Sequence, residues 1–288
     1  MSMNPSTNSP TLASNTSKKL PHINGMYWAL VVSSTTLGET AGDFISQTLD
    51  FGYGGASAVL LALFVIATIL QVLFAKQHAW MYWTTLTLAS IGGTTLCDWI
   101  TRSLGLGYPL GSLTIFISLV ATLSAWKWWT RSRDLGAALD KIGESLYWLT
   151  ILTSSTFGTV LGDMLSKNEL DLDGHALGDT LFGEFVTRHG FGLGGIGFGD
   201  TASTVALLVL LAAVAVVTLK TRVSRVSCYW GGIIVTHPLG AAAGDFMTKD
   251  DGLHLGNAWA TLLLVVVLAA VAVLAYRNNK NHAATLAE

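Results

Sequence analysis

Four aspartates at one fixed spacing are the residues of this sequence best suited to chemistry. Each aspartate lies fifteen residues after the Trp of a Tyr-Trp pair, and no copy carries an insertion between the two. The aspartates are Asp43, Asp98, Asp163 and Asp245, and the matching tryptophans are Trp28, Trp83, Trp148 and Trp230. Carboxylates bind hard cations and exchange protons, so the pattern indicates a cation site to which four repeats each contribute a ligand.

Polar residues precede each aspartate at helical spacing. Residues four and eight positions before an Asp share its face of a helix. Four before are Glu39, Thr94, Thr159 and Ala241, and eight before are Thr35, Ser90, Ser155 and His237. Oxygen ligands favour Mg²⁺, Ca²⁺ or Mn²⁺, and His237 shifts the preference towards Mn²⁺ or another transition metal. Glu39 is the most informative ligand candidate, whereas His237, next to Pro238, is equally suited to be a hydrogen-bonded core residue.

Glycines accompany each aspartate. They stand five residues before it at Gly38, Gly93, Gly158 and Gly240, and one residue before it at Gly42, Gly162 and Gly244. The second repeat has Cys97 in place of the later glycine. Small residues four apart let helix backbones approach closely, so the pattern predicts that the aspartate-bearing helices pack against one another.

The elements that must position these residues are membrane helices. The 288 residues are 51% hydrophobic and only 12% charged, which is typical of a membrane protein. Apolar stretches about long enough to cross a core of roughly 30 Å lie near 26–46, 55–75, 81–101, 110–130, 146–166, 200–220, 228–248 and 255–275. We therefore expect an all-α integral membrane protein with eight transmembrane helices. In each pair the first helix begins with Tyr-Trp, whose tryptophan we expect to anchor at the membrane interface, and the second is a scaffold.

The expected domain organisation is one transmembrane domain, 26–280, between a disordered cytoplasmic tail, 1–25, and a short tail, 281–288. Its repeats span about 26–76, 81–130, 146–220 and 228–276. The third repeat contains an insertion, 166–195, which is rich in acidic residues and forms either a solvated outer loop or a binding loop.

The basic residues indicate the orientation. Twelve of the 16 Lys and Arg residues fall on the side that carries both termini, so the positive-inside rule places that side in the cytoplasm. Two helices per repeat return the chain to its starting side, so the four repeats run parallel around an axis along the membrane normal. In this pseudo-fourfold arrangement the aspartates form a ring about 22 Å from the tryptophans, at 1.5 Å per residue. Alternatively, each Gly-Asp only ends its helix at headgroup water.

Four tandem two-helix repeats, each with a Trp and a Gly-Asp end, resemble the family of bacterial multi-pass membrane proteins defined by a repeat of unknown function. The resemblance covers nearly the whole chain after residue 25, although the second repeat has Cys97-Asp98 and the third carries the insertion. It implies an integral protein of the bacterial inner membrane.

An ionised Asp inside a bilayer costs roughly 2.5 to 3.5 kcal/mol, so grouped intramembrane carboxylates predict a pathway for cations or protons. The first hypothesis is a transporter, more specifically an exporter, of a divalent metal such as Mn²⁺, with the bilayer as partner and protons as coupling ions. The metal is then a substrate and no cofactor is permanently bound. A cation channel and a membrane sensor or enzyme using the outer loop are the alternatives. The sequence contains no nucleotide-binding loop and no metalloprotease motif, so we do not expect an enzyme. Nothing in it indicates nucleic-acid binding, and it leaves the oligomeric state open.

Overall fold

The computed structural model describes residues 21, 23–74, 78–131, 139–167, 196–221, 223–250 and 252–285. Within these ranges all regular secondary structure is helical. The helices are α1 (Gly25–Asp43), α2 (Gly52–Leu73), α3 (Ala79–Asp98), α4 (Gly107–Thr130), α5 (Lys141–Ser166), α7 (Asp200–Lys220), α8 (Arg225–Thr248) and α9 (Gly256–Thr285), with π-helical turns η1 (Phe44–Thr48) and η2 (Trp99–Ser103). The predicted tail up to residue 20, the loop 168–195 and residues 286–288 lie outside the described residues.

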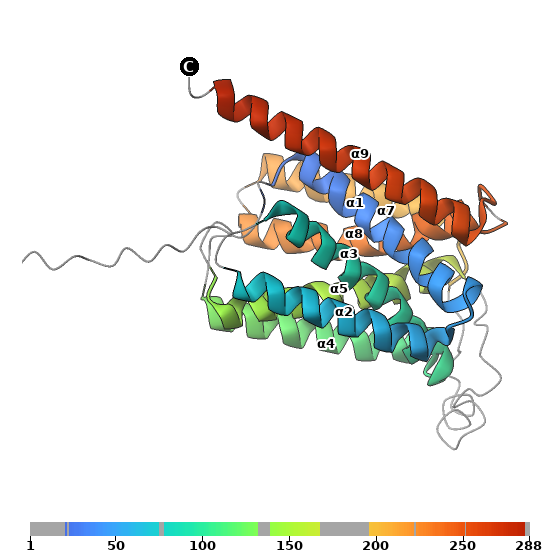
Figure 1. The fold of residues 1–288 in the computed structure, drawn as a ribbon. Helices are drawn as coiled ribbons and strands as arrows, with labels where there is room; N and C mark the ends of the chain where they lie inside the picture. The colour runs from blue at the N-terminus through green and yellow to red at the C-terminus, as the bar shows by residue number, and fades with distance from the viewer. Residues whose placement is uncertain are drawn as a thin grey trace, which may run out of the picture.

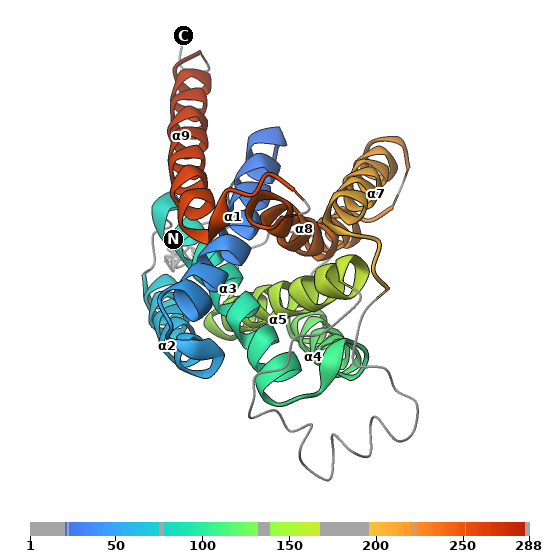
Figure 2. The same ribbon diagram turned by 90° about the vertical axis from the view of Figure 1, so that its right-hand side faces the viewer.

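The four aspartate-bearing helices form a closed inner ring. Helix α1 packs against α3, α3 against α5, α5 against α8, and α8 against α1 (Figure 2). All four begin at one end of the bundle with their Tyr-Trp pairs and finish near their aspartates at the other end. The inner helices are therefore parallel to one another.

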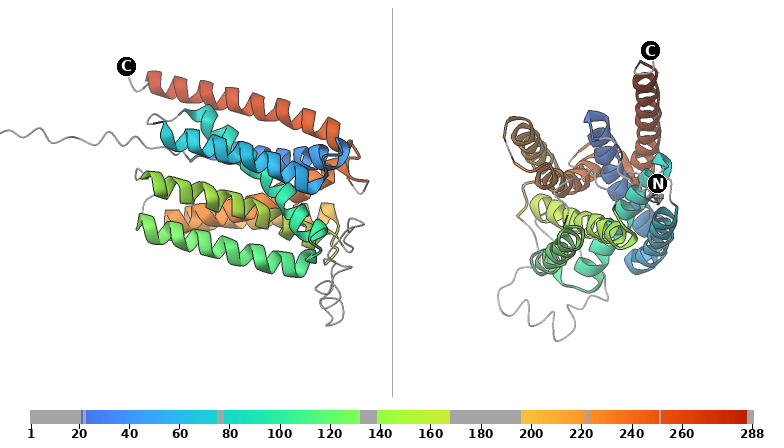
Figure 3. Two further views of the ribbon diagram at one scale, coloured as in Figure 1. Left: turned by 60° about the horizontal axis from the view of Figure 1, so that its bottom comes forward. Right: turned by 90° about the vertical axis from the view of Figure 1, so that its left-hand side faces the viewer.

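Each outer helix packs against the inner helix of the following repeat. Helix α2 covers α3, α4 covers α5, and α7 covers α8. The last outer helix, α9, returns to cover α1 of the first repeat (Figures 1 and 3). Because every repeat supplies the cover for its neighbour, no single repeat can bury its inner helix alone.

The reversals between inner and outer helices depend on glycine. Gly52, Gly107 and Gly256, the first residues of α2, α4 and α9, have φ angles of 65°, 68° and 70°. Gly199, directly before α7, has a φ angle of 78°. Residues with a Cβ rarely adopt this left-handed backbone, so glycine is required at each start.

Only the outer helices have the apolar character that we predicted for all eight. Among the described residues, four helices are long and apolar enough to cross a membrane, namely α2, α4, α7 and α9. The prediction of apolar membrane-spanning character therefore holds for four of the eight described helices and is wrong for the inner four. The inner helices carry Ser, Thr, Gly and Asp, and each is covered by two inner neighbours and an outer helix, so they do not need apolar surfaces.

The glycines five residues before each aspartate lie where neighbouring inner helices come closest. A methyl group added to Gly38 would lie 2.5 Å from the Ser90 Cβ atom, closer than packed atoms can approach. The same relation joins each such glycine to the residue eight before the Asp of the next repeat. The pairs are Gly38 with Ser90, Gly93 with Ser155, Gly158 with His237, and Gly240 with Thr35.

The second set of glycines repeats this contact one turn later. A methyl group at Gly42 would lie 2.9 Å from the Thr94 Cγ2 atom, and one at Gly244 would lie 2.7 Å from the Glu39 Cβ atom. Gly162 meets Ala241 in the same way, at 3.0 Å. The inner ring is thus closed by the same glycine contact from each repeat to the next.

Candidate functional site

The four aspartates lie buried at the end of the inner ring. Their exposed fractions are 4% for Asp43, 2% for Asp98, and 1% for both Asp163 and Asp245. Helix ends that only met headgroup water would leave these carboxylates exposed. The packing therefore favours a shared internal site over four separate helix ends.

Basic side chains join three of the aspartates into a chain of ion pairs. The Arg102 Nε atom lies 2.8 Å from Asp98 Oδ1, and its Nη2 atom lies 3.5 Å from Asp163 Oδ2. The Lys167 Nζ atom lies 2.5 Å from Asp163 Oδ1 and 2.9 Å from Asp245 Oδ2. Each of these cations thus connects the aspartate of its own repeat to the aspartate of the next.

These cations occupy a fixed position that our sequence reasoning missed. The residues four after the aspartates are Gln47, Arg102, Lys167 and Lys249. Lys249 pairs with Asp245, the aspartate of its own repeat. An acidic residue followed four positions later by a basic one is a known helix pairing signal, and three repeats show it. The ring of four mutually repelling carboxylates expected from the sequence is thus largely compensated.

The first repeat breaks the pattern. Gln47 donates a hydrogen bond of 2.7 Å from Nε2 to Asp43 Oδ1, where the other repeats place a cation. No ion pair within the described part of the chain joins Asp43 to a basic side chain. Among the four aspartates, Asp43 is therefore the one available to a cation that the protein does not itself supply.

Three carboxylates converge at this break. Oxygen atoms of Glu39, Asp43 and Asp245 all lie within 4.8 Å of one another, and the three residues are buried. Thr94 donates a hydrogen bond of 3.1 Å to Glu39 Oε2, and Thr159 lies 3.5 Å from the same oxygen. The cluster therefore combines three carboxylates with two hydroxyl groups that orient Glu39.

The remaining predicted ligands serve other contacts. His237 places Nδ1 2.8 Å from the carbonyl oxygen of Ile233, while its buried Nε2 has no hydrogen-bond partner in the described structure. It does not belong to the three-carboxylate cluster, because it lies two turns, or about 12 Å, along α8 from Asp245. The predicted supporting residues Thr35, Ser90 and Ser155 instead bond backbone carbonyl groups of Val32 and Thr236, of Leu86, and of Ser90 respectively.

The opposite end of the inner ring holds a feature absent from our sequence expectations. The four tyrosine hydroxyl groups form a closed ring of hydrogen bonds. The oxygen–oxygen distances are 2.8 Å for Tyr27–Tyr82, 2.8 Å for Tyr82–Tyr147, 2.6 Å for Tyr147–Tyr229 and 3.0 Å for Tyr229–Tyr27. We call this feature the tyrosine ring. The available signal was the tyrosine that recurs sixteen residues before each aspartate. At 3.6 residues per turn this step places the two residues on nearly opposite faces of an ideal helix, so the spacing by itself did not predict a second inward-facing ring.

The tryptophans of the same pairs do not act as interface anchors in the way we predicted. Trp148 and Trp230 are 1% and 4% exposed, so the prediction is wrong for these two. Trp28 and Trp83 are half-buried and pack against Tyr229 and Tyr27, with ring centroids 6.2 Å and 5.4 Å apart. The tyrosines lie inside the ring of helices, and their tryptophan neighbours therefore fill the spaces between the helices.

A layer of aliphatic side chains lies one turn from the tyrosine ring on the side of the aspartates. It contains Val31, Leu86, Ile151 and Ile233, which stand twelve residues before the four aspartates. All four are 0% exposed and belong to the same hydrophobic cluster as the tyrosines. We call this set the aliphatic layer. The tyrosine ring and the aliphatic layer are therefore uncharged, whereas the layer of aspartates at the other end is ionic.

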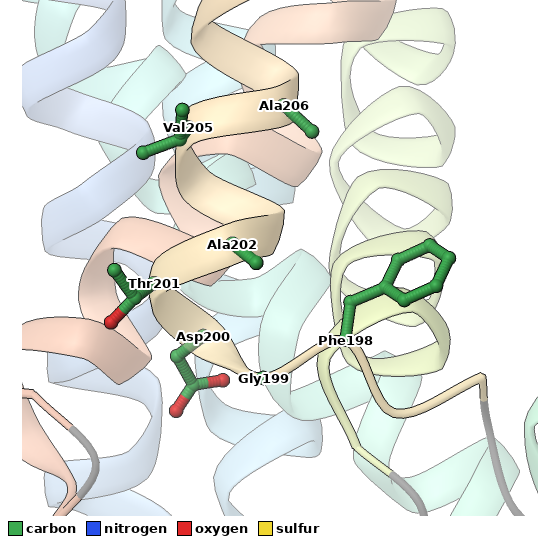
Figure 4. Close-up of a pocket in the computed structure, with 7 residues that line it drawn as sticks. All are labelled: Phe198, Gly199, Asp200, Thr201, Ala202, Val205 and Ala206. Carbon is green, nitrogen blue, oxygen red and sulfur yellow. The ribbon is translucent and has the colours of Figure 1, made fainter.

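A separate surface pocket lies at the start of α7 (Figure 4). Its lining includes Phe198 and Val205, which are 60% and 55% exposed, and Asp200 is the one ionisable residue among the seven that line it. The three-carboxylate cluster does not line this pocket. It therefore adds no ligand to the candidate site.

The repeats observed in the structure coincide with a known sequence family. The model of the family described as "Repeat of Unknown Function (DUF347)" matches residues 26–77, 81–132, 146–224 and 228–281. The chain belongs to this family and contains four tandem copies of its repeat. Searches of curated proteins and of solved structures give no match.

Proposed function

We propose that this protein is a membrane transporter of a divalent metal cation such as Mn²⁺, working as an exporter. The observation that carries the proposal is the convergence of Glu39, Asp43 and Asp245 within 4.8 Å. Asp245 pairs with Lys167 and Lys249, whereas Glu39 and Asp43 form no ion pair among the described residues. Carboxylate oxygens at this spacing can bind one hard cation together.

The charge of the ionic layer supports a divalent substrate. Apart from buried Asp200 on the outer helix α7, the layer has five carboxylates, including Glu39, and three basic side chains. These eight groups together carry two net negative charges when all of them are ionised. One divalent cation, or two protons, would balance that charge. This equivalence is the physical basis for exchanging protons against metal at one site.

The ligand set is compatible with Mg²⁺, Ca²⁺ and Mn²⁺. Its donors are oxygen atoms, and no thiolate lies in the cluster to favour a softer ion. Since His237 lies outside the cluster, the specific preference for Mn²⁺ over Ca²⁺ rests on the experiment below.

The proposed setting is the bacterial inner membrane. The exposed apolar surfaces of α2, α4, α7 and α9 would face lipid, and the inner helices would cross the bilayer within that shell. All eight helices would then span the membrane in a pseudo-fourfold arrangement. With the basic side in the cytoplasm, both ends of this chain are cytoplasmic and the aspartates lie towards the outside.

A transporter explains the filled inner ring better than a channel does. A channel needs a continuous path for ions, whereas the tyrosine ring and the aliphatic layer occupy one half of the inner ring with buried side chains. Alternating exposure of the carboxylates to the two sides fits this arrangement.

Metal flux in reconstituted liposomes tests the proposal. We expect saturable Mn²⁺ entry, compared with Ca²⁺ and Mg²⁺ in the same preparation. Asp43→Asn and Glu39→Gln should abolish the flux while the protein still folds. Asp50→Asn is the matched control, because Asp50 is exposed and lies outside the cluster. Normal flux in both cluster variants, or no flux of any of the three ions in the unmodified protein, would contradict the proposal.

A further inference from the structure

The tyrosine ring uses all of its hydroxyl groups internally. Four hydroxyl hydrogens serve four oxygen–oxygen contacts of 2.6 to 3.0 Å, so each phenol can donate one bond and accept one. When the bonds run in one direction around the ring, every hydroxyl hydrogen is donated to a neighbouring tyrosine and none is left for water. A hydrated cation that approached along the inner ring would therefore meet four hydroxyl groups bonded to one another, and it could pass only if they separated.

The aliphatic layer reinforces this closure. Val31, Leu86, Ile151 and Ile233 come from the four inner helices, are completely buried, and pack in one cluster with the tyrosines. An ion in contact with such a layer would lose its hydration without gaining a ligand, which costs far more than thermal energy. The two layers separate the carboxylates from the end at which the inner helices begin.

We propose that the tyrosine ring and the aliphatic layer together form a gate that closes the carboxylate site towards the face where α1 begins. This proposal rests on the transport function proposed above, because it specifies how one side of the pathway is shut. Opening requires the four hydroxyl groups to separate and the aliphatic side chains to move apart.

The chemistry of tyrosine suits a gate better than a permanent core. Phenylalanine would fill the same space without burying four hydroxyl groups. A hydroxyl–hydroxyl bond can be exchanged for bonds to water at a net cost of only about 0.5 to 1.5 kcal/mol. Separated tyrosines would thus be stabilised by water, and the same bonds would form again on closing.

Chemical labelling of one cysteine tests the gate without depending on transport. In a Cys97→Ala, Cys228→Ala background, Thr94→Cys places a thiol beyond both layers, because Thr94 contacts Glu39 and Thr159. A membrane-impermeant cationic methanethiosulfonate is added from the face where α1 begins, in inverted vesicles or in intact cells. An affinity tag on the N-terminal segment identifies that face, and detergent-unfolded protein defines complete labelling.

Two kinds of variant are then compared in this background. Tyr82→Phe with Leu86→Ala weakens both layers, whereas Tyr276→Phe with Leu262→Ala makes the same chemical changes at exposed positions of α9. We expect the labelling rate to rise about tenfold in the first pair, as loss of roughly 1.4 kcal/mol from the closed state implies, and to stay unchanged in the second. If the first pair does not fold, the single variant Tyr147→Phe replaces it.

Equal labelling rates in the gate variants and in the matched control would overturn the proposal, whether both are fast or both are slow. The outcome is separable from the transport experiment. A labelling gain in a protein that carries none of the three ions would support the gate and reject the substrate class. Metal flux without a faster labelling rate in the gate variants would support the substrate class and reject the gate.

Discussion

The two ends of the inner ring each bury four identical polar side chains, but they supply the partners of these side chains in different ways. At one end the four repeats contribute identical tyrosines, joined by four hydrogen bonds of 2.6 to 3.0 Å. At the other end they contribute identical aspartates but unlike partners, because Gln47 stands where the other repeats have Arg or Lys. Neutral donors and acceptors can repeat four times and satisfy one another.

Four identical charged groups cannot satisfy one another in this way and also leave a carboxylate available to bind a cation. Four aspartates without cations would repel one another, and four aspartates with four cations would form a complete ionic ring. With three cations and one amide, Glu39 and Asp43 of the first repeat have no ion pair among the described residues and lie close to Asp245. The candidate site therefore lies where Gln47 departs from the fourfold pattern, and the repeat itself does not locate it.

The ionic end should be the more sensitive to losing one side chain. Lys167→Met removes the cation between Asp163 and Asp245. Among the described residues, it leaves buried Asp163 with only the 3.5 Å contact to Arg102, and buried Asp245 with only Lys249. We expect the free energy of unfolding to fall by about 3 kcal/mol, measured by denaturant or thermal unfolding in detergent. Lys141→Met, at an exposed lysine that begins α5, the helix that ends just before Lys167, is the control and should change little. Equal stability of the two variants would show that the ionic chain does not hold this end together.

The glycine contacts between the two ends should come next in size. Gly240→Ala places a methyl group against Thr35 on α1 and should lower the free energy of unfolding by about 2 kcal/mol. Gly231→Ala is a matched control in α8, because nothing lies within 4 Å of the added methyl group. A control variant as unstable as Gly240→Ala would assign the effect to helix backbone changes and remove the closure of the ring from the explanation.

The neutral end should tolerate a single loss better. Tyr147→Phe keeps the ring packing but removes the hydroxyl that contacts both Tyr82 and Tyr229. We expect a decrease of about 1 kcal/mol in the free energy of unfolding, with Tyr276→Phe on exposed α9 as control. A loss larger than that of Lys167→Met would reverse the ranking of the two ends.

Placing a basic residue in the first repeat, as in the other three, should change the free energy of unfolding least and metal transport most. Gln47→Lys adds the missing cation beside Asp43. Residue 47 is exposed although Asp43 is buried, so solvent screens the new ion pair and we expect it to add about 0 to 1 kcal/mol to stability. The added charge should nevertheless abolish Mn²⁺ flux in liposomes, because it competes with the metal for the same carboxylates. Gln47→Met, neutral and similar in size, should retain flux. Undiminished flux in Gln47→Lys would contradict the role assigned to Glu39 and Asp43.

Much of the architecture follows from the sequence because its signals are local and repeated. The spacing of Trp and Asp predicts parallel inner helices, and glycines four apart predict their close approach, as at Gly38 and Gly42. The same repeated spacing predicts the aspartates as site residues. Apolar length, in contrast, overestimated the lipid-facing helices, since a helix covered by protein on all sides can carry polar residues and still be buried.

The sequence alone determined the four repeats, the helical class and the aspartates at the ends of the inner helices. The tertiary structure decided how the repeats meet, since each outer helix covers the inner helix of the next repeat. It also decided which carboxylates converge, namely Glu39 with Asp43 and Asp245, and which are held by Arg102 and Lys167. The physical reason is that an ion pair within a helix can be read from a spacing of four residues, whereas contacts between repeats depend on how the ring of helices closes.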